Sequence, residues 1–173
     1  MPRFEVDEIE RAFRTFWRTG MLCEDWNAWA NLFSEDVAYH ERMLGSLRGR
    51  EEVRAWILSL MDKYPSIYGV YEWHAVDPSG RVVFYMQNRR DMPDGSVIDF
   101  PGITILQYAG DGLWSSEEDF WAPKLAEAAY AAHAKACQEH PGHRDKKTRA
   151  NWGSGPAWTI GAATWFDRPA VSP

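Results

Sequence analysis

The chain has 173 residues, of which 45% are hydrophobic and 25% are charged, and this is the composition of one soluble globular domain. Its formal net charge of -6 offers no basic surface to a nucleic acid. No apolar run approaches the roughly 18 residues of a membrane span, and the charged segment 1–10 does not resemble a signal peptide. Two cysteines in a domain of this length do not make a disulfide framework. We therefore expect a cytoplasmic protein with no nucleic-acid or membrane partner.

The aromatic content is high, with 10 Trp, 7 Tyr and 8 Phe. A core of this size needs fewer bulky rings for packing alone. We therefore expect a cavity with aromatic walls.

The first part of the chain predicts two helices and then a short β-ribbon. The evidence for each helix is a set of apolar residues at helical spacing. These residues are Ile9, Phe13, Phe16 and Trp17 in the first helix and Leu22, Trp26, Trp29 and Phe33 in the second. Residues 37–41 then alternate in the manner of a strand, and Gly45 and Gly49 bracket a second extended piece.

A third helix is predicted over 50–63, where Pro65 ends it, and period-two strands follow over 70–76, 81–90, 97–108 and 113–121. Pro123 then opens a last helix that continues to Cys137. Antiparallel hairpins with helices gathered at one side define an α+β fold.

Residues 139–173 differ from the domain that we place at 1–138. They are charged at first and then rich in Gly, Ala and aromatic residues, including Trp152, Trp158 and Trp165. A disordered tail seldom carries so many large apolar rings. We expect this extension to pack on the domain or on a partner subunit.

Three sequence segments carry a family resemblance: residues 32–39 (LFSEDVAY), residues 49–53 (GREEV) and residues 112–121 (GLWSSEEDFW). Together with the order of elements, they resemble the NTF2-like superfamily and, more narrowly, its SnoaL-like group. The resemblance implies a curved antiparallel sheet wrapped on N-terminal helices to form a cone, with a deep apolar pocket and often a homodimer. It leaves the chemistry open, because the superfamily holds isomerases, cyclases, dehydratases, epoxide hydrolases and binding modules.

The two catalytic candidates are Glu41 and Asp119. Strand alternation places Glu41 on the face of Val37 and Tyr39, and Asp119 on the face of Glu117. The resemblance implies that Glu41 stands where ketosteroid-isomerase-like members carry their base. It likewise implies that Asp119 stands where cyclases and epoxide hydrolases carry an acidic catalytic residue.

The same alternation gives the remaining wall of the pocket. The predicted substrate-binding residues are Tyr39, Trp73, Met86, Asn88, Arg90, Phe100, Thr104, Glu117 and Trp121. No metal and no other cofactor is expected.

A carboxyl group in an aromatic cavity loses hydration, which raises its pKa, and a second carboxylate nearby separates the two titrations. We therefore expect cofactor-independent acid-base catalysis on a small, mostly apolar substrate that bears a carbonyl group: isomerisation, aldol-type cyclisation or dehydration. Glu41 would abstract the proton and Asp119 would protonate the oxyanion or leaving group. The alternatives are a non-catalytic small-molecule-binding module and an epoxide hydrolase.

The chain departs from several subgroups. Ketosteroid isomerases carry a Tyr on the first helix, where this chain has Phe16 or Trp17. Limonene-epoxide-hydrolase-like members use an Asp-Arg-Asp set with a Tyr and an Asn, of which only Tyr39 and Asp119 align. SnoaL-like cyclases require mainly the acid at Asp119 and are contradicted least.

Other interpretations remain open. The catalytic carboxylates could face away from the pocket or be neutralised by Arg42 or Arg90, or, with Glu117, they could hold a hard cation. A second motif, His133-x3-Cys137-x2-His140-x2-His143, offers ligands that zinc accepts, although the helix dipole alone also favours histidines at a helix C-terminus.

Overall fold

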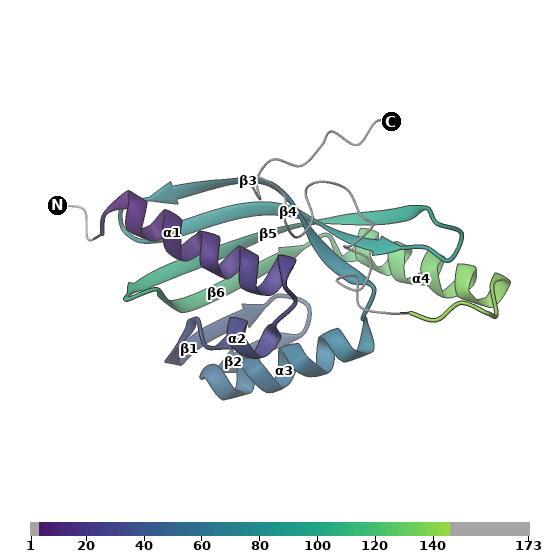
Figure 1. The fold of residues 1–173 in the computed structure, drawn as a ribbon, viewed down its shortest axis with the longest axis horizontal. Helices are drawn as coiled ribbons and strands as arrows, with labels where there is room; N and C mark the ends of the chain where they lie inside the picture. Colours follow the sequence, from purple (N-terminus) through teal and green to yellow (C-terminus); the bar gives the residue numbers. More distant parts are fainter. Residues whose placement is uncertain (1–3, 146–173) are drawn as a thin grey trace.

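A curved, mixed sheet carries the fold in the computed structural model, which describes residues 4–145 (Figure 1). The elements are α1 (Val6–Trp17), a π-helical turn η1 (Arg18–Leu22), α2 (Trp26–Ala30), β1 (Phe33–Glu41), β2 (Gly45–Arg48), α3 (Arg50–Lys63), β3 (Ile67–Asp77), β4 (Arg81–Asp91), β5 (Val97–Gly110), β6 (Leu113–Trp121) and α4 (Pro123–Glu139). The predicted α+β class is confirmed, as are the bounds predicted for α3 and β6.

The strand order in the sheet is β2-β1-β6-β5-β4-β3. Neighbours are antiparallel except β1 and β6, which run parallel, so the sheet is mixed rather than wholly antiparallel as predicted. The sequence revealed only the local hairpins, because turn residues signal a hairpin whereas a pairing between distant strands leaves no local mark.

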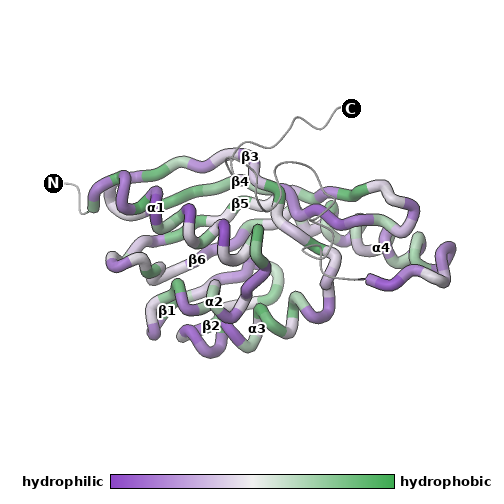
Figure 2. Tube along the Cα trace, viewed as in Figure 1, coloured by the Kyte–Doolittle hydropathy of each residue, from purple (hydrophilic) through white to green (hydrophobic). Residues whose placement is uncertain are grey.

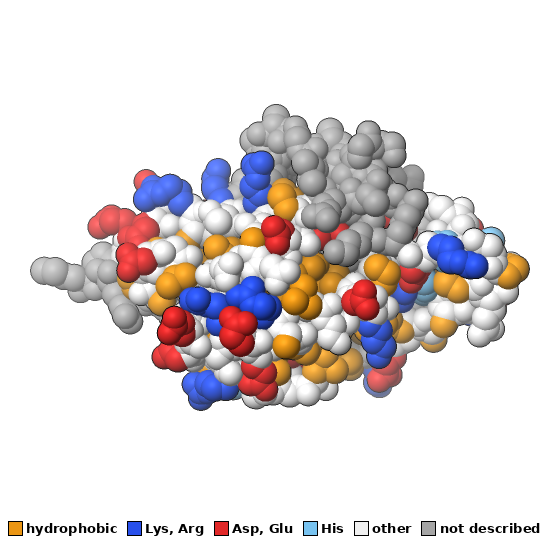
Figure 3. Space-filling view, turned by 60° about the horizontal axis from the view of Figure 1, so that its bottom comes forward, with side chains coloured by type: hydrophobic (Ala, Val, Ile, Leu, Met, Phe, Trp, Pro, Cys, Tyr) orange, Lys and Arg blue, Asp and Glu red, His pale blue; other side chains and the backbone are white. Residues whose placement is uncertain are grey.

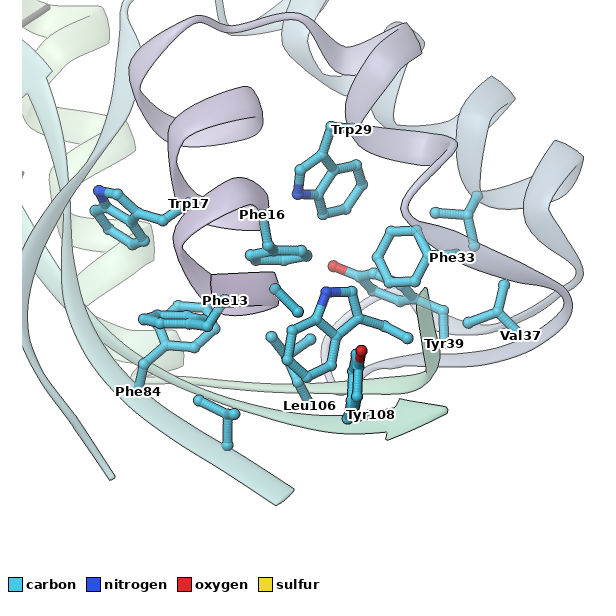
Figure 4. Packing of buried hydrophobic residues seen from close by; sticks show 14 of the residues in the cluster. Phe13, Phe16, Trp17, Trp29, Phe33, Val37, Tyr39, Phe84, Leu106 and Tyr108 are labelled. Carbon is cyan, nitrogen blue, oxygen red and sulfur yellow. The ribbon is translucent and has the colours of Figure 1, made fainter. Parts of the chain in front are cut away.

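The N-terminal helices cover one face of the sheet. The helix α1 lies across it and contacts β3, whereas α2 packs on α3 and α3 packs on β1 (Figure 1). Hydrophilic and hydrophobic residues alternate along α1 (Figure 2), and its apolar side chains Phe13, Phe16 and Trp17 are fully buried. They point toward Phe84 of β4 and Leu106 of β5 (Figure 4), so the core is largely an aromatic cluster between α1 and the sheet.

The second predicted helix is shorter than expected. It spans Trp26–Ala30 alone, because Glu24 adopts a positive φ of 50° and interrupts the helical path, and Asp25 then caps the new helix by accepting a hydrogen bond from the Ala28 N–H. Leu22 accordingly ends η1, and Phe33 begins β1.

Beyond α4, the structure describes the chain as far as residue 145. The predicted packing of the extension concerns mainly residues 146–173, which lie outside the described residues. Within 4–145, none of the helices combines the length and apolar character that a membrane span requires. On the face drawn in Figure 3, basic and acidic side chains are interspersed with hydrophobic ones.

Candidate active site

A cavity of about 340 Å³ lies between the helices and the sheet. Aromatic side chains from both layers line it, among them Trp26, Trp29, Trp56, Phe100, Trp121 and Tyr130. Its volume falls at the lower end of the roughly 300–1,000 Å³ found for small-molecule pockets. The cavity with aromatic walls that the composition predicted is therefore present, at a size that suits a guest of one or two rings.

Asp119 is held by two hydroxyl groups in this cavity. Tyr39 Oη donates to its Oδ2 at 2.6 Å, and Thr104 Oγ1 donates to its Oδ1 at 2.5 Å. The sheet register brings the three side chains together, because β6 lies between β1 and β5, with Thr104 directly opposite Asp119 and Tyr39 opposite Glu117. Each oxygen of the Asp119 carboxylate thus has a fixed donor.

Burial raises the pKa of Asp119 to about 6, although the hydrogen bonds from Thr104 and Tyr39 lower it. Asp119 is only 3% exposed, and the nearby charge of Glu41 adds to the rise. At neutral pH the group is therefore mostly ionised, yet it is much more basic than an ordinary aspartate.

Glu117 is the protonated member of the pair. Burial first, and the charge of Asp119 second, raise the pKa of Glu117 well above its usual range. Its Oε2 is buried and has no hydrogen-bond partner among residues 4–145, which adds to the cost of a negative charge there. The pKa of Glu117 is raised further above its usual range than that of Asp119, so Glu117 holds a proton more tightly than its neighbour does.

Tyr39 connects the two carboxyl groups. Its Oη lies 2.6 Å from Asp119 Oδ2 and 3.2 Å from Glu117 Oε1, and it has a single proton to donate. Burial raises the pKa of Tyr39 well above its usual value, with the charge of Asp119 and the hydrogen bonds to Asp119 and Glu117 adding to the rise, so the phenol stays neutral. The shorter contact indicates that it donates to Asp119.

Glu41 also lines the cavity, but backbone groups hold its carboxylate. The Met43 N–H donates to both oxygens at 3.2 Å, and the Leu44 N–H donates to Oε2 at 2.5 Å. Glu41 therefore fastens the turn between β1 and β2, directly opposite Asp119 in the register.

Both candidate carboxylates face the cavity, so the alternation in β1 and β6 was interpreted correctly. Neither predicted arginine neutralises them: Arg42 pairs with Glu118, and Arg90 pairs with Asp145 at 2.6 Å.

Of the predicted substrate-binding residues, seven line the cavity: Tyr39, Met86, Asn88, Phe100, Thr104, Glu117 and Trp121. Trp73 does not, since it is 47% exposed and stacks on Tyr85. The reason is a shift in the register of β3 between Tyr71 and Trp73, which exchanges the two faces of the strand from that point on. A bulge of this kind has no signal in the alternation of the sequence.

Arg90 is also placed outside the cavity wall. It is buried, but its guanidinium group donates to Ser66 at 2.9 Å and to Asp145 at 2.6 Å, and lies over the ring of Tyr64. The predicted orienting role for Arg90 in the pocket is therefore wrong, because a residue far along the chain competes for its charge.

Sequence reasoning missed one cavity carboxylate, Glu24. It is 4% exposed and lies between η1 and α2, with its backbone in the left-handed region. No periodic pattern marks such a position, and the only hint is the rarity of a non-glycine residue there. Within the described residues, all strongly ionisable side chains of the cavity wall are acidic: Glu24, Glu41, Glu117 and Asp119. This wall favours neutral or cationic guests over anions.

Known structures share this fold. A protein from Jannaschia sp. CCS1, assigned as a SnoaL-like polyketide cyclase, aligns with a TM-score of 0.60 at 18% identity over 76% of this chain and 98% of its own. A protein from Catenulispora acidiphila with a ketosteroid-isomerase-like fold, in complex with trimethylamine, aligns with a TM-score of 0.59 at 18% identity. The alignment covers 73% of this chain and 95% of that protein. An NTF2-like protein from Anabaena variabilis aligns with a TM-score of 0.56 at 14% identity, over 68% of this chain and 89% of its own.

The search of curated proteins gave no match. The family comparison did, since the model of the SnoaL-like domain matches residues 9–117, from the first turns of α1 to the strand that carries Glu117 and Asp119. With this match over more than half of the sequence, and with the curved sheet and deep cavity described above, the chain belongs to the SnoaL-like domain family.

Proposed function

We propose that the protein is an enzyme that performs acid-base catalysis without a cofactor on a small, mostly apolar carbonyl compound. The observation that carries this proposal is the pair of buried carboxyl groups, Asp119 and Glu117, that both contact Tyr39 in the aromatic cavity. Burial raises the pKa of Asp119 to about 6 and raises that of Glu117 well above its usual range. A base and an acid side by side in an aromatic cavity are what proton abstraction beside a carbonyl group requires.

In the proposed reaction, Asp119 takes a proton from the carbon next to the carbonyl group. The electrons of the broken C–H bond move into the carbonyl group and form an enolate, whose oxygen is stabilised by a hydrogen bond from the Glu117 carboxyl group. Return of the proton to another carbon gives an isomer. Attack of the enolate carbon on a second carbonyl group closes a ring, and loss of a hydroxyl group that receives the proton gives a dehydrated product.

This assignment differs from the roles expected from the sequence, where Glu41 was the base and Asp119 the acid: the base is now Asp119 and the acid is Glu117. Glu41 accepts hydrogen bonds from two backbone N–H groups, which hold its carboxylate against the turn between β1 and β2. Glu41 retains a positioning role, because its negative charge helps to keep the pKa of Asp119 raised.

The test measures turnover of a panel of neutral cyclic ketones, diketones and β-hydroxyketones. Exchange of substrate protons with deuterated water reports the abstraction step. Asp119→Asn keeps the shape of the side chain and removes the base, so turnover falls by about 10²-fold or more. Glu118→Gln is the matched control, because this neighbour pairs with Arg42 instead of lining the cavity. Equal turnover in wild type and Asp119→Asn would exclude Asp119 as the base, and a similar loss in Glu41→Gln alone would return that role to Glu41.

A second candidate is a non-catalytic module that binds a small alkylammonium ion. Aromatic faces attract such cations, and the buried carboxylates would balance the charge. The relative from Catenulispora acidiphila holds trimethylamine. Titration calorimetry with trimethylamine decides: binding that disappears in Asp119→Asn, with no turnover of any carbonyl compound, favours this candidate.

We also propose that the protein forms a homodimer in the cytoplasm. Trp73, Tyr85, Ile103 and Phe120 are consecutive partners in the register of β3 to β6, and Trp73, Ile103 and Phe120 are exposed large apolar side chains. Such a row suits the interface of two copies. Analytical ultracentrifugation should give a dimer for wild type and a monomer for Ile103→Arg. A monomeric wild type would contradict it.

A further inference from the structure

A second group of chemically active side chains lies outside the cavity, where α4 ends. His133 and Cys137 belong to α4, and His143 and Asp145 to the segment that follows it. One ligand atom from each residue, a ring nitrogen, the thiol sulfur or a carboxylate oxygen, lies within 4.8 Å of all the others. None of the four lines the cavity, so this cluster is independent of the proposed acid-base site.

Local structure brings the four together. His133 and Cys137 are one helical turn apart and therefore share a face of α4. The helix ends at Glu139, and the His143 N–H donates to the His140 carbonyl at 2.8 Å, which turns the chain back along the helix. The rings of His133 and His143 then lie 6.0 Å apart between centroids, with Asp145 between them.

The distances suit a tetrahedral metal centre. Metal–ligand lengths of about 2.0–2.3 Å place neighbouring ligand atoms of a tetrahedron roughly 3.3–3.6 Å apart. Asp145 Oδ1 lies 3.3 Å from His133 Nε2 and 2.8 Å from His143 Nε2. Cys137 Sγ lies 3.8 Å from His133 Nε2. Small movements of the side chains would therefore bring all four atoms to bonding distance of one ion.

The surroundings support the same conclusion. His133 is only 3% exposed, so this imidazole is fixed by packing. Arg90 donates to Oδ2 of Asp145 at 2.6 Å and leaves Oδ1 directed at the two histidines, the arrangement by which an outer residue orients a metal ligand. A thiolate and a carboxylate would neutralise a divalent ion.

We propose that His133, Cys137, His143 and Asp145 bind one zinc ion with a structural role. A thiolate with two imidazoles selects zinc over calcium or magnesium, which prefer oxygen ligands, and four protein ligands leave no open position for catalysis. The ion would fasten the segment after α4 to the helix and, through Arg90, to β4. The ligand set suggested by the sequence motif contained His140. In the folded chain Asp145 takes the place of His140 in that set.

His140 supplies the matched control. It lies at the same helix end, but its ring Nδ1 is 2.9 Å from the Ala136 carbonyl, and it does not belong to the cluster. Cys137 and His143 are partly exposed, so Cys137→Ser and His143→Ala create no buried cavity. Circular dichroism checks that each variant is folded.

The experiment uses the full chain without an affinity tag, stripped with a chelator and titrated with zinc chloride against a chromophoric competitor. Wild type and His140→Ala should bind one zinc ion per chain, and Cys137→Ser and His143→Ala should bind about 100-fold more weakly or not at all. With cobalt in place of zinc, a thiolate-to-metal absorption band should appear in wild type and vanish in Cys137→Ser. Zinc should raise the melting temperature of wild type and of His140→Ala, and should leave that of Cys137→Ser and His143→Ala unchanged. No zinc binding in wild type, or equal binding in all four proteins, would overturn the proposal.

Discussion

At the scale of single residues, Asp119 combines two properties that oppose each other. It is buried, which destabilises its charged form, and it is mostly ionised at neutral pH because its pKa is about 6. The fold therefore holds a charge at a position where a neutral side chain would be more stable. Sites adapted for activity often carry this cost in stability.

The first prediction concerns the stability of Asp119→Asn. The pKa of Asp119 rises from about 3.9 in the unfolded chain to about 6 in the folded one, so the folded state binds the proton more tightly. Wild type should lose stability as the pH rises from about 4 to 6, by on the order of 3 kcal/mol. Asp119→Asn should lack this loss and be the more stable protein at pH 7, although the proposed function predicts that it loses activity. Urea unfolding at pH 4 and pH 7 measures both; parallel pH dependences would contradict the prediction.

The second prediction concerns Tyr39→Phe. The hydrogen bond from Tyr39 lowers the pKa of Asp119, so its removal should raise that pKa above about 6. The acidic limb of the profile of kcat/KM against pH should move to higher pH. Tyr85→Phe, on the outer face of β4, is the control and should leave the profile unchanged. An unshifted profile in Tyr39→Phe would show that the limb reports another group.

At the scale of elements, the junction between η1 and α2 positions the aromatic wall of the cavity. Gly20 lies against the indole of Trp29, where an added Cβ would come within 2.5 Å of ring atom Cδ1. Trp29 is itself fully buried and packs on Phe16 and Phe33, so the ring has no room to retreat. The close approach of backbone and ring therefore depends on glycine.

The third prediction follows for Gly20→Ala. Overpacking costs about 1–3 kcal/mol, whereas alanine gains at most about 1 kcal/mol over glycine in a helix, so the clash should decide the sign. Guanidinium unfolding should show a less stable protein. Gly142→Ala is the control, because a Cβ there meets nothing within 4 Å. A stabilised Gly20→Ala would mean that the Trp29 ring shifts at little cost.

At the scale of the whole molecule, the charge of the cavity wall should select among ligands. The fourth prediction compares cyclohexanone with cyclohexanecarboxylate, which are similar in size and differ in charge. The anion should bind at least about tenfold more weakly, because the described wall offers it buried carboxylates and no basic side chain. Ligand-induced shifts in melting temperature at pH 8 measure this. Equal shifts for the two ligands would contradict it.

Local patterns in the sequence were sufficient to predict most of the elements and the buried faces of most strands. Period-two alternation in β1 and β6 was enough to direct Tyr39, Glu41, Glu117 and Asp119 into the cavity. Helical periodicity gave the bounds of α3. These features are local, because the spacing of apolar residues along a few turns or a few pleats already decides which side of an element is buried.

The interactions among those side chains could not be predicted from local patterns, because they depend on how distant segments pack together. The parallel pairing of β1 with β6 places Tyr39 against Glu117 across 78 residues of sequence, and burial then raises the pKa of Glu117 well above its usual range. The bulge in β3 turned Trp73 outward, and Asp145 drew Arg90 away from the pocket. The hydrogen-bond partners, protonation states and directions of these side chains depend on contacts between distant segments and on the loss of water around them. Neither factor produces a periodic pattern in the sequence.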